Sequence, residues 1–409
     1  MGNGILRVYQ EDWFPFQSLP SALQEFTART GIRTELSWDT VGVGTIEHMF
    51  EQMVASFASE IPAYDVVCTD EIILRRMARS GDVLDIGPKM ARDDIDLGDV
   101  SESTRQAVQY DGKVLGLPCV NVSSMLLCRR DLLDRYGLPL PSDWAELRTV
   151  AATLQDAVRK DTGEEFYGFE TRGAPGGGHA VWTIGSFLGS HGVRWLSKDG
   201  ATQRFGDAHA TAVSAYLDLI RTVCPPEQAE ISFGEMRRDY QAGRVGIIMD
   251  VGMEYAHILA NNPAYADISE VALVPAGPAG RAPNLYAPPW AIPARTDMAD
   301  EAWELVKFLA SDTRLMQDGL DSNAVETSSS AVLYSPEFDR HFRPDILSAV
   351  RCSRAVACEE RPFSDAGIEV CEVVGNALSA AIVQGNDAET ALRAISDGFG
   401  KLADEGLLG

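Results

Sequence analysis

Lysine is scarce in this chain, and long apolar runs are missing from it. The 409 residues include 60 acidic and 35 basic side chains, for a formal net charge of −25. Such a chain repels phosphate backbones, so nucleic-acid binding is disfavoured, and solubility is the simplest explanation of the charge. No run approaches the roughly 18 apolar residues that a membrane-spanning helix needs. A soluble globular protein is therefore expected, and its length predicts two lobes.

Sequence signatures of enzymes are also missing. The chain has no Gly-x-Ser-x-Gly elbow, no His-Glu-x-x-His pair and no Walker A loop. Gly42 and Gly44 follow a predicted strand, but the third glycine of a dinucleotide fingerprint is absent, and a helix N-terminus that binds any polar ligand explains them equally. An enzyme is thus a minor alternative, and no cofactor is expected.

The seven cysteines include no Cys-x-x-Cys pair, and no histidine lies at zinc-finger spacing. No metal site is therefore expected. Cys68, Cys119 and Cys128 lie in apolar, strand-like runs and are expected in the core. Cys352 and Cys358 are close enough in sequence for a local disulfide in an oxidising compartment, and whether they pair is left open.

Strand-like runs alternate with helical patterns, which predicts an α/β fold on mostly parallel sheets. Strands are expected at residues 5–10, 33–38, 65–69, 114–117, 124–129, 245–250, 270–275 and 285–294. Helices are expected at 21–30, 45–58, 71–79, from 144 onward, and at 181–190, 208–222, 254–260, 297–311, 367–384 and 388–405. Asp143 with Glu146 predicts a capping box, and Asp297 is a predicted helix cap.

Several motifs follow one another in a characteristic order. Residues 110–118 read Tyr-Asp-Gly-Lys-Val-Leu-Gly-Leu-Pro, residues 125–130 form an apolar strand that ends in two arginines, and residues 140–147 read Leu-Pro-Ser-Asp-Trp-Ala-Glu-Leu. Residues 187–192 (Phe-Leu-Gly-Ser-His-Gly) and the Trp-Ala-Ile-Pro run at 290–293, followed by the helix at 302–309, continue the pattern. This order resembles the extracellular solute-binding proteins of carbohydrate importers, the maltose-binding-protein-like group. One departure is residues 324–329, where an arginine common in that group is missing.

The resemblance implies a two-lobed periplasmic-binding-protein fold of type II, with hinge segments and a ligand cleft. The N-terminal lobe would hold residues 1–117 and 276–322, and the C-terminal lobe residues 118–275 and 323–409. The implied function is to capture a carbohydrate by lobe closure and to deliver it to the membrane permease of an ABC importer, as a monomer in the periplasm. Met1 to Gly4 run straight into a strand, so an export signal was removed and a start was added, or the protein is cytosolic.

Sugar capture needs flat aromatic faces and many hydrogen-bonding groups. In doubly wound sheets ligands bind beyond the carboxyl ends of the strands. Candidate aromatic rings are Trp290, Trp13 and Trp182. Candidate polar contacts are Asp70, Glu71, Glu11, Asp12, Asp250, Asn121, His179 and Arg361. Each has a purely structural alternative, such as a core tryptophan, a helix cap or a solvated loop side chain.

The chemical class of the ligand is left open at this point. Acidic side chains at the predicted site suit polyhydroxyl or cationic ligands, whereas Arg361 and His179 suit an anion. The alternative to a sugar is therefore a non-sugar solute on the same scaffold: a polyol, an anionic sugar derivative, a polyamine or a peptide.

Overall fold

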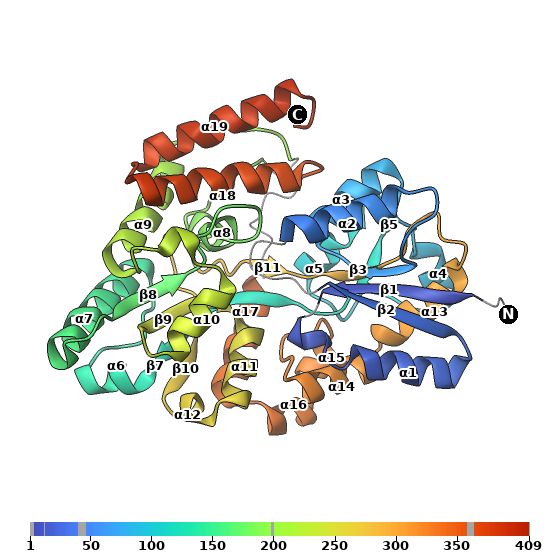
Figure 1. Cartoon of the computed structure of the whole chain (residues 1–409), viewed down its shortest axis with the longest axis horizontal. Helices are drawn as coiled ribbons and strands as arrows, with labels where there is room; N and C mark the ends of the chain where they lie inside the picture. The colour runs from blue at the N-terminus through green and yellow to red at the C-terminus, as the bar shows by residue number, and fades with distance from the viewer. Residues whose placement is uncertain (1–3, 12, 40–45, 198–199, 358–363, 409) are drawn as a thin grey trace. The chain divides into compact units, whose positions relative to one another are not determined.

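The computed structural model describes residues 4–11, 13–39, 46–197, 200–357 and 364–408 (Figure 1). The chain divides into two compact units, and it passes between them three times. Unit 1 holds Met1–Val122 and Tyr286–Arg343, and unit 2 holds Ser123–Leu285 and Pro344–Gly409. Each boundary lies further along the chain than the predicted one. The third differs most, because the helices between residues 312 and 341 pack within unit 1.

Unit 1 is built on a five-stranded sheet with the order β2-β1-β3-β12-β6. Its strands are β1 (Ile5–Glu11), β2 (Arg33–Asp39), β3 (Val66–Cys68), β6 (Gly116–Pro118) and β12 (Pro289–Ala291). β1 pairs in parallel with β2 and β3, whereas β12 is antiparallel to both β3 and β6. The carboxyl ends of β1, β2, β3 and β6 therefore share one edge of the sheet with the amino end of β12.

Helices cover this sheet, and their ends follow local chemistry. They are η1 (Phe14–Phe16), α1 (Leu19–Thr30), α2 (Ile46–Ala58), α3 (Glu71–Ser80), α4 (Gly87–Arg92), α5 (Glu102–Ala107), α13 (Ala299–Leu309), α14 (Asp312–Ser322), α15 (Ser330–Leu333) and α16 (Pro336–His341). A small hairpin joins β4 (Gln109–Tyr110) to β5 (Lys113–Val114) through Asp111 and Gly112, both at positive φ, as a two-residue hairpin turn requires. The predicted cap of α13 is wrong: Met298 occupies that position, and no side chain caps the helix.

Unit 2 has a four-stranded path, β10-β7-β9-β8, with the short β11 (Leu285–Tyr286) paired to β7. The strands are β7 (Val122–Arg129), β8 (Tyr167–Thr171), β9 (Val245–Val251) and β10 (Ser269–Leu273). β8 and β9 are parallel, and β7 is antiparallel to β9 and β10, so the expectation of a mostly parallel sheet fails here. As a result, the carboxyl ends of β8 and β9 lie at the same edge as the start of β7.

The helices of unit 2 are α6 (Arg130–Tyr136), α7 (Trp144–Thr162), α8 (Ala180–Ser190), α9 (Asp207–Val223), η2 (Gln228–Glu230), α10 (Phe233–Gln241), α11 (Gly252–Asn261), α12 (Pro263–Ala266), α17 (Pro344–Val356), α18 (Gly367–Gln384) and α19 (Ala388–Asp404). Asp143 caps α7 by accepting from the N–H of Glu146 at 2.8 Å, as predicted. The Glu146 carboxylate reaches the N–H and hydroxyl of Ser142 rather than Asp143. The predicted reciprocal contact therefore shifts by one residue.

One described helix, α18, is long and apolar enough to cross a membrane by length and composition, with a mean hydropathy of 1.2. Its residues Val370, Cys371, Val374 and Leu378 are buried, and it lies alongside α19 (Figure 1) and against α8. A core helix passes the same test, and these contacts explain its composition within unit 2.

Three of the cysteines lie in strands or directly beside them. Cys68, Cys119 and Cys128 are 5 %, 3 % and 0 % exposed, which confirms them as core residues. The sulfur atoms of Cys68 and Cys119 lie 3.7 Å apart. Cys352 is exposed on α17, and its proposed partner Cys358 lies outside the described residues.

Candidate functional site

The edge of the unit 1 sheet carries a partly exposed indole, Trp13. It lies two residues after the end of β1 and precedes the turn η1, where its ring lies 5.9 Å from Phe14 and 6.1 Å from Phe16. The ring of Tyr286, at the start of the segment that returns to unit 1, is 6.2 Å away. These neighbours fix the orientation of Trp13 while leaving part of its ring accessible, as stacking on a ligand requires.

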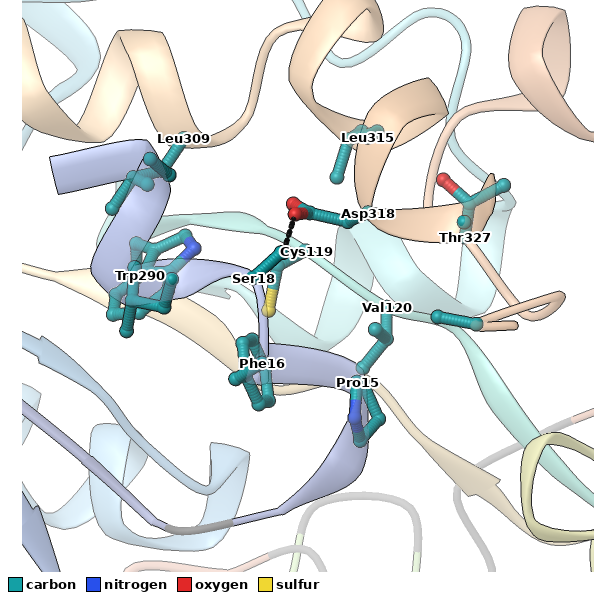
Figure 2. Close-up of a pocket in the computed structure, with 14 residues that line it drawn as sticks. Pro15, Phe16, Ser18, Cys119, Val120, Trp290, Leu309, Leu315, Asp318 and Thr327 are labelled. Atoms are coloured by element: carbon teal, nitrogen blue, oxygen red, sulfur yellow. Dashed lines mark hydrogen bonds between the residues drawn. The ribbon is translucent and has the colours of Figure 1, made fainter. Parts of the chain in front are cut away.

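Trp290 lies at the same edge, but it is only 2 % exposed. Its ring meets Phe16 edge-on at 5.8 Å and lines a cavity of about 20 Å³ (Figure 2). Ser18 and Asp318 are hydrogen bonded on another wall of that cavity. This volume holds about one water molecule, so the structure favours Trp13 over Trp290 as the stacking ring.

The predicted acidic contacts of unit 1 follow β1 and β3. Asp70 is 4 % exposed and accepts from the N–H of Ile72 at 2.8 Å, which confirms its role as the cap of α3. Glu71, in the first turn of that helix, is 0 % exposed. Glu11 ends β1, but its side chain, like the whole of Asp12, lies outside the described part of the chain. Ligand contact by these four residues stays a prediction.

Two buried amide groups at this edge have an unused acceptor. Asn121 lies just beyond β6 and donates from Nδ2 to Thr104 at 2.6 Å and to Ser101 at 3.1 Å. Its Oδ1 has no partner among the described residues, and the same is true of Oε1 of Gln10 near the end of β1. The two side chains are 4 % and 3 % exposed. Because a buried polar atom without a partner costs free energy, these acceptors are expected to meet a water or a ligand.

The edge of the unit 2 sheet is organised around Arg172, which directly follows β8. Its Nη2 donates to Oδ1 of Asp250 in β9 at 2.5 Å, and its Nη1 donates to the carbonyl of Gly178 at 3.2 Å. The guanidinium carbon lies 5.7 Å from the centre of the Trp182 ring and 5.4 Å from that of Phe233. An ion pair and two aromatic rings thus hold one guanidinium in place.

Three residues predicted separately meet in this cluster. Asp250 is 2 % exposed, Trp182 5 % and His179 3 %, and the ring of His179 is stacked 6.3 Å from Phe233. The sequence places them on β9, on α8 and just before α8, so only the fold brings them together. Whether they contact a ligand stays a prediction, as it does for Arg361, which lies outside the described residues.

Several polar atoms of this edge are buried without a hydrogen-bond partner among the described residues. They are Nε of Arg172, Nδ1 of His179 and Oγ of Ser124, which lies near the start of β7. Burial, with the positive charge of Arg172 as a second cause, lowers the pKa of His179 to about 4. The imidazole is therefore neutral at pH 7 and can both donate and accept.

Arg172 is the residue that sequence reasoning missed. No strand and no site residue is predicted around it, although it directly follows the five buried residues of β8. The available signal was a cation at the carboxyl end of the aromatic-rich run Phe166–Thr171. Gln10 and Ser124 gave no such signal, because they lie inside strand patterns.

The two edges offer hydrogen-bond donors, acceptors and one open ring, which is the chemistry of non-covalent capture. Among the described residues, no three His, Cys, Asp or Glu side chains gather where they could hold a metal ion. What each edge can do is bind hydroxyl groups and an apolar face.

Solved structures share this fold along nearly the whole chain. The maltose-bound MalE3 of T. maritima superimposes with a TM-score of 0.84 at 22 % identity, covering 97 % of this chain and 99 % of that one. A solute-binding protein of Agrobacterium radiobacter in complex with ribitol gives 0.84 at 21 % identity, covering 98 % and 99 %. At these identities the likeness establishes the α/β, two-lobed solute-binding fold.

Relatives were also found by sequence. A mannitol-binding protein of Pseudomonas aeruginosa is 25 % identical over 251 residues, which are 60 % of this chain and 56 % of that protein. A probable ABC transporter-binding protein of Deinococcus radiodurans is 30 % identical over 203 residues, 48 % and 47 % of the two chains. The chain thus spans about half the length of these relatives. The family model for the bacterial extracellular solute-binding protein matches residues 15–313, and the chain therefore belongs to that family.

Proposed function

We propose that this protein captures a polyhydroxylated solute, a sugar or a polyol, outside the cytoplasmic membrane and delivers it to the permease of an ABC importer. The family supports a transport role without catalysis. Relatives or neighbours described as binding mannitol, ribitol and maltose support the ligand class. A periplasmic location and a monomeric state are part of the proposal.

The observation that carries the ligand class is the set of buried polar atoms without partners at the two sheet edges. Gln10 and Asn121 supply acceptors in unit 1, and Arg172, His179 and Ser124 supply further groups in unit 2. A hydroxyl both donates and accepts, so ligand hydroxyls can satisfy the open groups of either edge. Trp13 adds an accessible ring for the C–H face of the ligand.

The test is a binding panel on protein freed of bound ligand by unfolding and refolding. Thermal melting and intrinsic tryptophan fluorescence are followed against mannitol, ribitol, glucose, maltose, a polyamine and a dipeptide. A sugar or polyol should give a saturable rise in melting temperature, since ligand at 100 times its Kd adds about 2.7 kcal/mol to stability. Recovery of that compound unchanged after incubation is expected of a binding protein.

A response to the polyamine or the dipeptide alone would overturn the proposed ligand class. Consumption of a panel compound would overturn the non-catalytic role. Closure of the two lobes on the ligand remains a prediction, and it is checked by a ligand-dependent fall in the radius of gyration in small-angle X-ray scattering.

A further inference from the structure

Resting on the proposed function, we infer that the Arg172–Asp250 pair restricts the ligand to electrically neutral polyhydroxyl compounds. A ligand hydroxyl accepts from Nε of Arg172 and donates to the free carboxylate oxygen of Asp250. The pair therefore selects against carboxylate, phosphate and ammonium forms of the same carbon skeleton.

The open hydrogen-bonding positions of the pair carry this inference. Of the guanidinium nitrogens, Nη1 and Nη2 are engaged, whereas Nε is buried and has no partner among the described residues. Asp250 accepts from Arg172 through Oδ1, and no described residue donates to its Oδ2. Because Nε and Nη2 lie on the same side of the guanidinium fork, the open N–H faces the side on which the carboxylate lies.

The pair cannot turn away to satisfy these atoms elsewhere. Trp182 and Phe233 lie against the guanidinium, and the carbonyl of Gly178 holds Nη1. On the other side, Asp250 lies in the buried strand β9, and its backbone N–H meets the hydroxyl of Tyr255. The open donor and the open acceptor are thus fixed in place before a ligand arrives.

Only a neutral group that both donates and accepts fits this arrangement. A carboxylate can accept from Nε but cannot donate to Asp250, and it is repelled by that carboxylate. An ammonium can donate to Asp250 but cannot accept from Nε, and it is repelled by Arg172. The side chains are 14 % and 2 % exposed, so water screens such repulsion only weakly.

The neighbouring side chain adds no charge that would change this balance. His179, with its ring stacked on Phe233, is held neutral at pH 7 by burial and by Arg172. Arg172 and Asp250 cancel each other, so the cluster formed with Trp182, Phe233 and His179 presents no net charge to a ligand.

The test compares ligands that differ only in charge at one carbon. Isothermal titration calorimetry at pH 7 is run with D-mannitol, D-mannonate and 1-amino-1-deoxy-D-mannitol, and with ribitol and its matching aldonate and amine. The wild-type protein should bind the neutral member of a series at least about 10- to 100-fold more tightly than either charged member, the effect expected of one unmet hydrogen bond to a charged group.

Variants separate the roles of the two side chains. Asp250→Asn should narrow or reverse the preference against the aldonate, because Arg172 is then no longer neutralised. Arg172→Gln should narrow or reverse the preference against the amine, because the charge of Asp250 is then no longer neutralised. Arg172→Lys keeps the charge but loses Nε–H, so it should weaken neutral binding about 10-fold or more while keeping the discrimination against the amine. Far-ultraviolet circular dichroism and the melting temperature report whether each variant is folded.

The control is Arg135→Gln, which removes an exposed arginine paired with Asp161 at 3.2 Å in the same unit. It should leave all affinities unchanged. If the wild type binds a neutral polyol but prefers its aldonate or its amine, or if folded Arg172 and Asp250 variants keep wild-type preferences, the inference is overturned while the proposed function stands. If no member of any series and no panel sugar binds the wild type, the proposed function is overturned, and the inference with it.

Discussion

Trp13 and Trp290 lie at the same edge of one sheet, and their different burial predicts different mutant behaviour. Trp13→Ala should weaken ligand binding about 3- to 10-fold, the value of one aromatic contact, with little change in melting temperature. Trp290→Phe should cost about 1–3 kcal/mol of stability, because the ring fills the space beside Phe16. Titration calorimetry and urea unfolding on both variants check this, and loss of affinity in the Trp290 variant alone would reverse the assignment.

Glu170 is a buried carboxyl group whose charge should oppose folding. It is 0 % exposed in β8, and neither oxygen has a hydrogen-bond partner among the described residues. Burial raises its pKa to about 8, with Asp239 as the next cause. Its folded pKa thus lies above the ordinary value of 4.5. The Glu170 carboxyl therefore makes its full contribution to stability below pH 4.5, and this contribution is lost as the pH rises through 8.

The wild-type protein should lose about 1 kcal/mol of unfolding free energy between pH 7 and pH 8 from this group alone. Glu170→Gln should remove that part of the pH dependence, whereas Glu164→Gln, at an exposed position before β8, should not. Urea unfolding at the two pH values measures the difference. The lowered pKa of His179 makes stability rise with pH, and it does so mainly below pH 6.5. It therefore does not account for a loss of stability between pH 7 and pH 8. Equal slopes in the wild type and the Glu170 variant would show that this carboxyl is not the group responsible.

At the residue scale, the polar residues at strand ends could be predicted, but the side chains that contact them could not. Asp70 after β3 and Asp250 at the end of β9 were both found from the alternation of strands and polar residues. Arg172 was missed because its function depends on Asp250 and Trp182, which are 78 and 10 positions away. The burial of a side chain could not be predicted either. The sequence around Trp290, which follows two prolines, is compatible with an exposed ring and with a buried one.

At the scale of elements, β8 and α7 approach each other so closely at Gly168 that adding one methyl group there should force them apart. A Cβ at Gly168 would lie 2.0 Å from the carbonyl oxygen of Ala151. Gly168→Ala should therefore cost at least about 1–3 kcal/mol. Gly400→Ala in α19, where a Cβ meets nothing within 4 Å, should instead stabilise by about 0.5–1 kcal/mol. Opposite shifts of the urea midpoint are expected, and a neutral Gly168 variant would contradict the close packing.

Element boundaries followed local signals wherever those signals were unambiguous. Asp143 began α7, and Gly81 ended α3 in the left-handed conformation. Two predictions failed for physical reasons. Asp297 stands one residue too early to cap α13. The strand expected at residues 285–294 is split into β11 and β12, because Pro288 has no N–H to donate to a neighbouring strand.

At the scale of the whole molecule, the order of strands within each sheet could not be predicted from chain order. β12 is encoded after all the strands of unit 2, yet it lies between β3 and β6 of unit 1. No local pattern in residues 289–291 indicates which strands will flank them. The resemblance to known binding proteins supplied the two lobes, whereas the hinge positions depended on packing by α14 and its neighbours.

This interleaving predicts that residues 1–122 do not fold alone. Without β12, the strand β6 loses the one strand that pairs with it among the described residues, and β3 exposes a buried edge. The ends left by removing residues 123–285 are adjacent, because β11 pairs with β7 and the N–H of Ser124 meets the carbonyl of Asn284 at 3.1 Å. Residues 1–122 joined to 286–343 by a short glycine-serine linker should therefore fold as unit 1.

The fragment 1–122 lacks β12 and the helices that follow it, whereas the joined protein contains them. Circular dichroism and cooperative urea unfolding should distinguish a folded joined chain from an unfolded 1–122 fragment. Cooperative unfolding of residues 1–122 alone would mean that β2, β1 and β3 with their helices form a sufficient core. In that case β12 would be an addition to unit 1 rather than the strand that completes it.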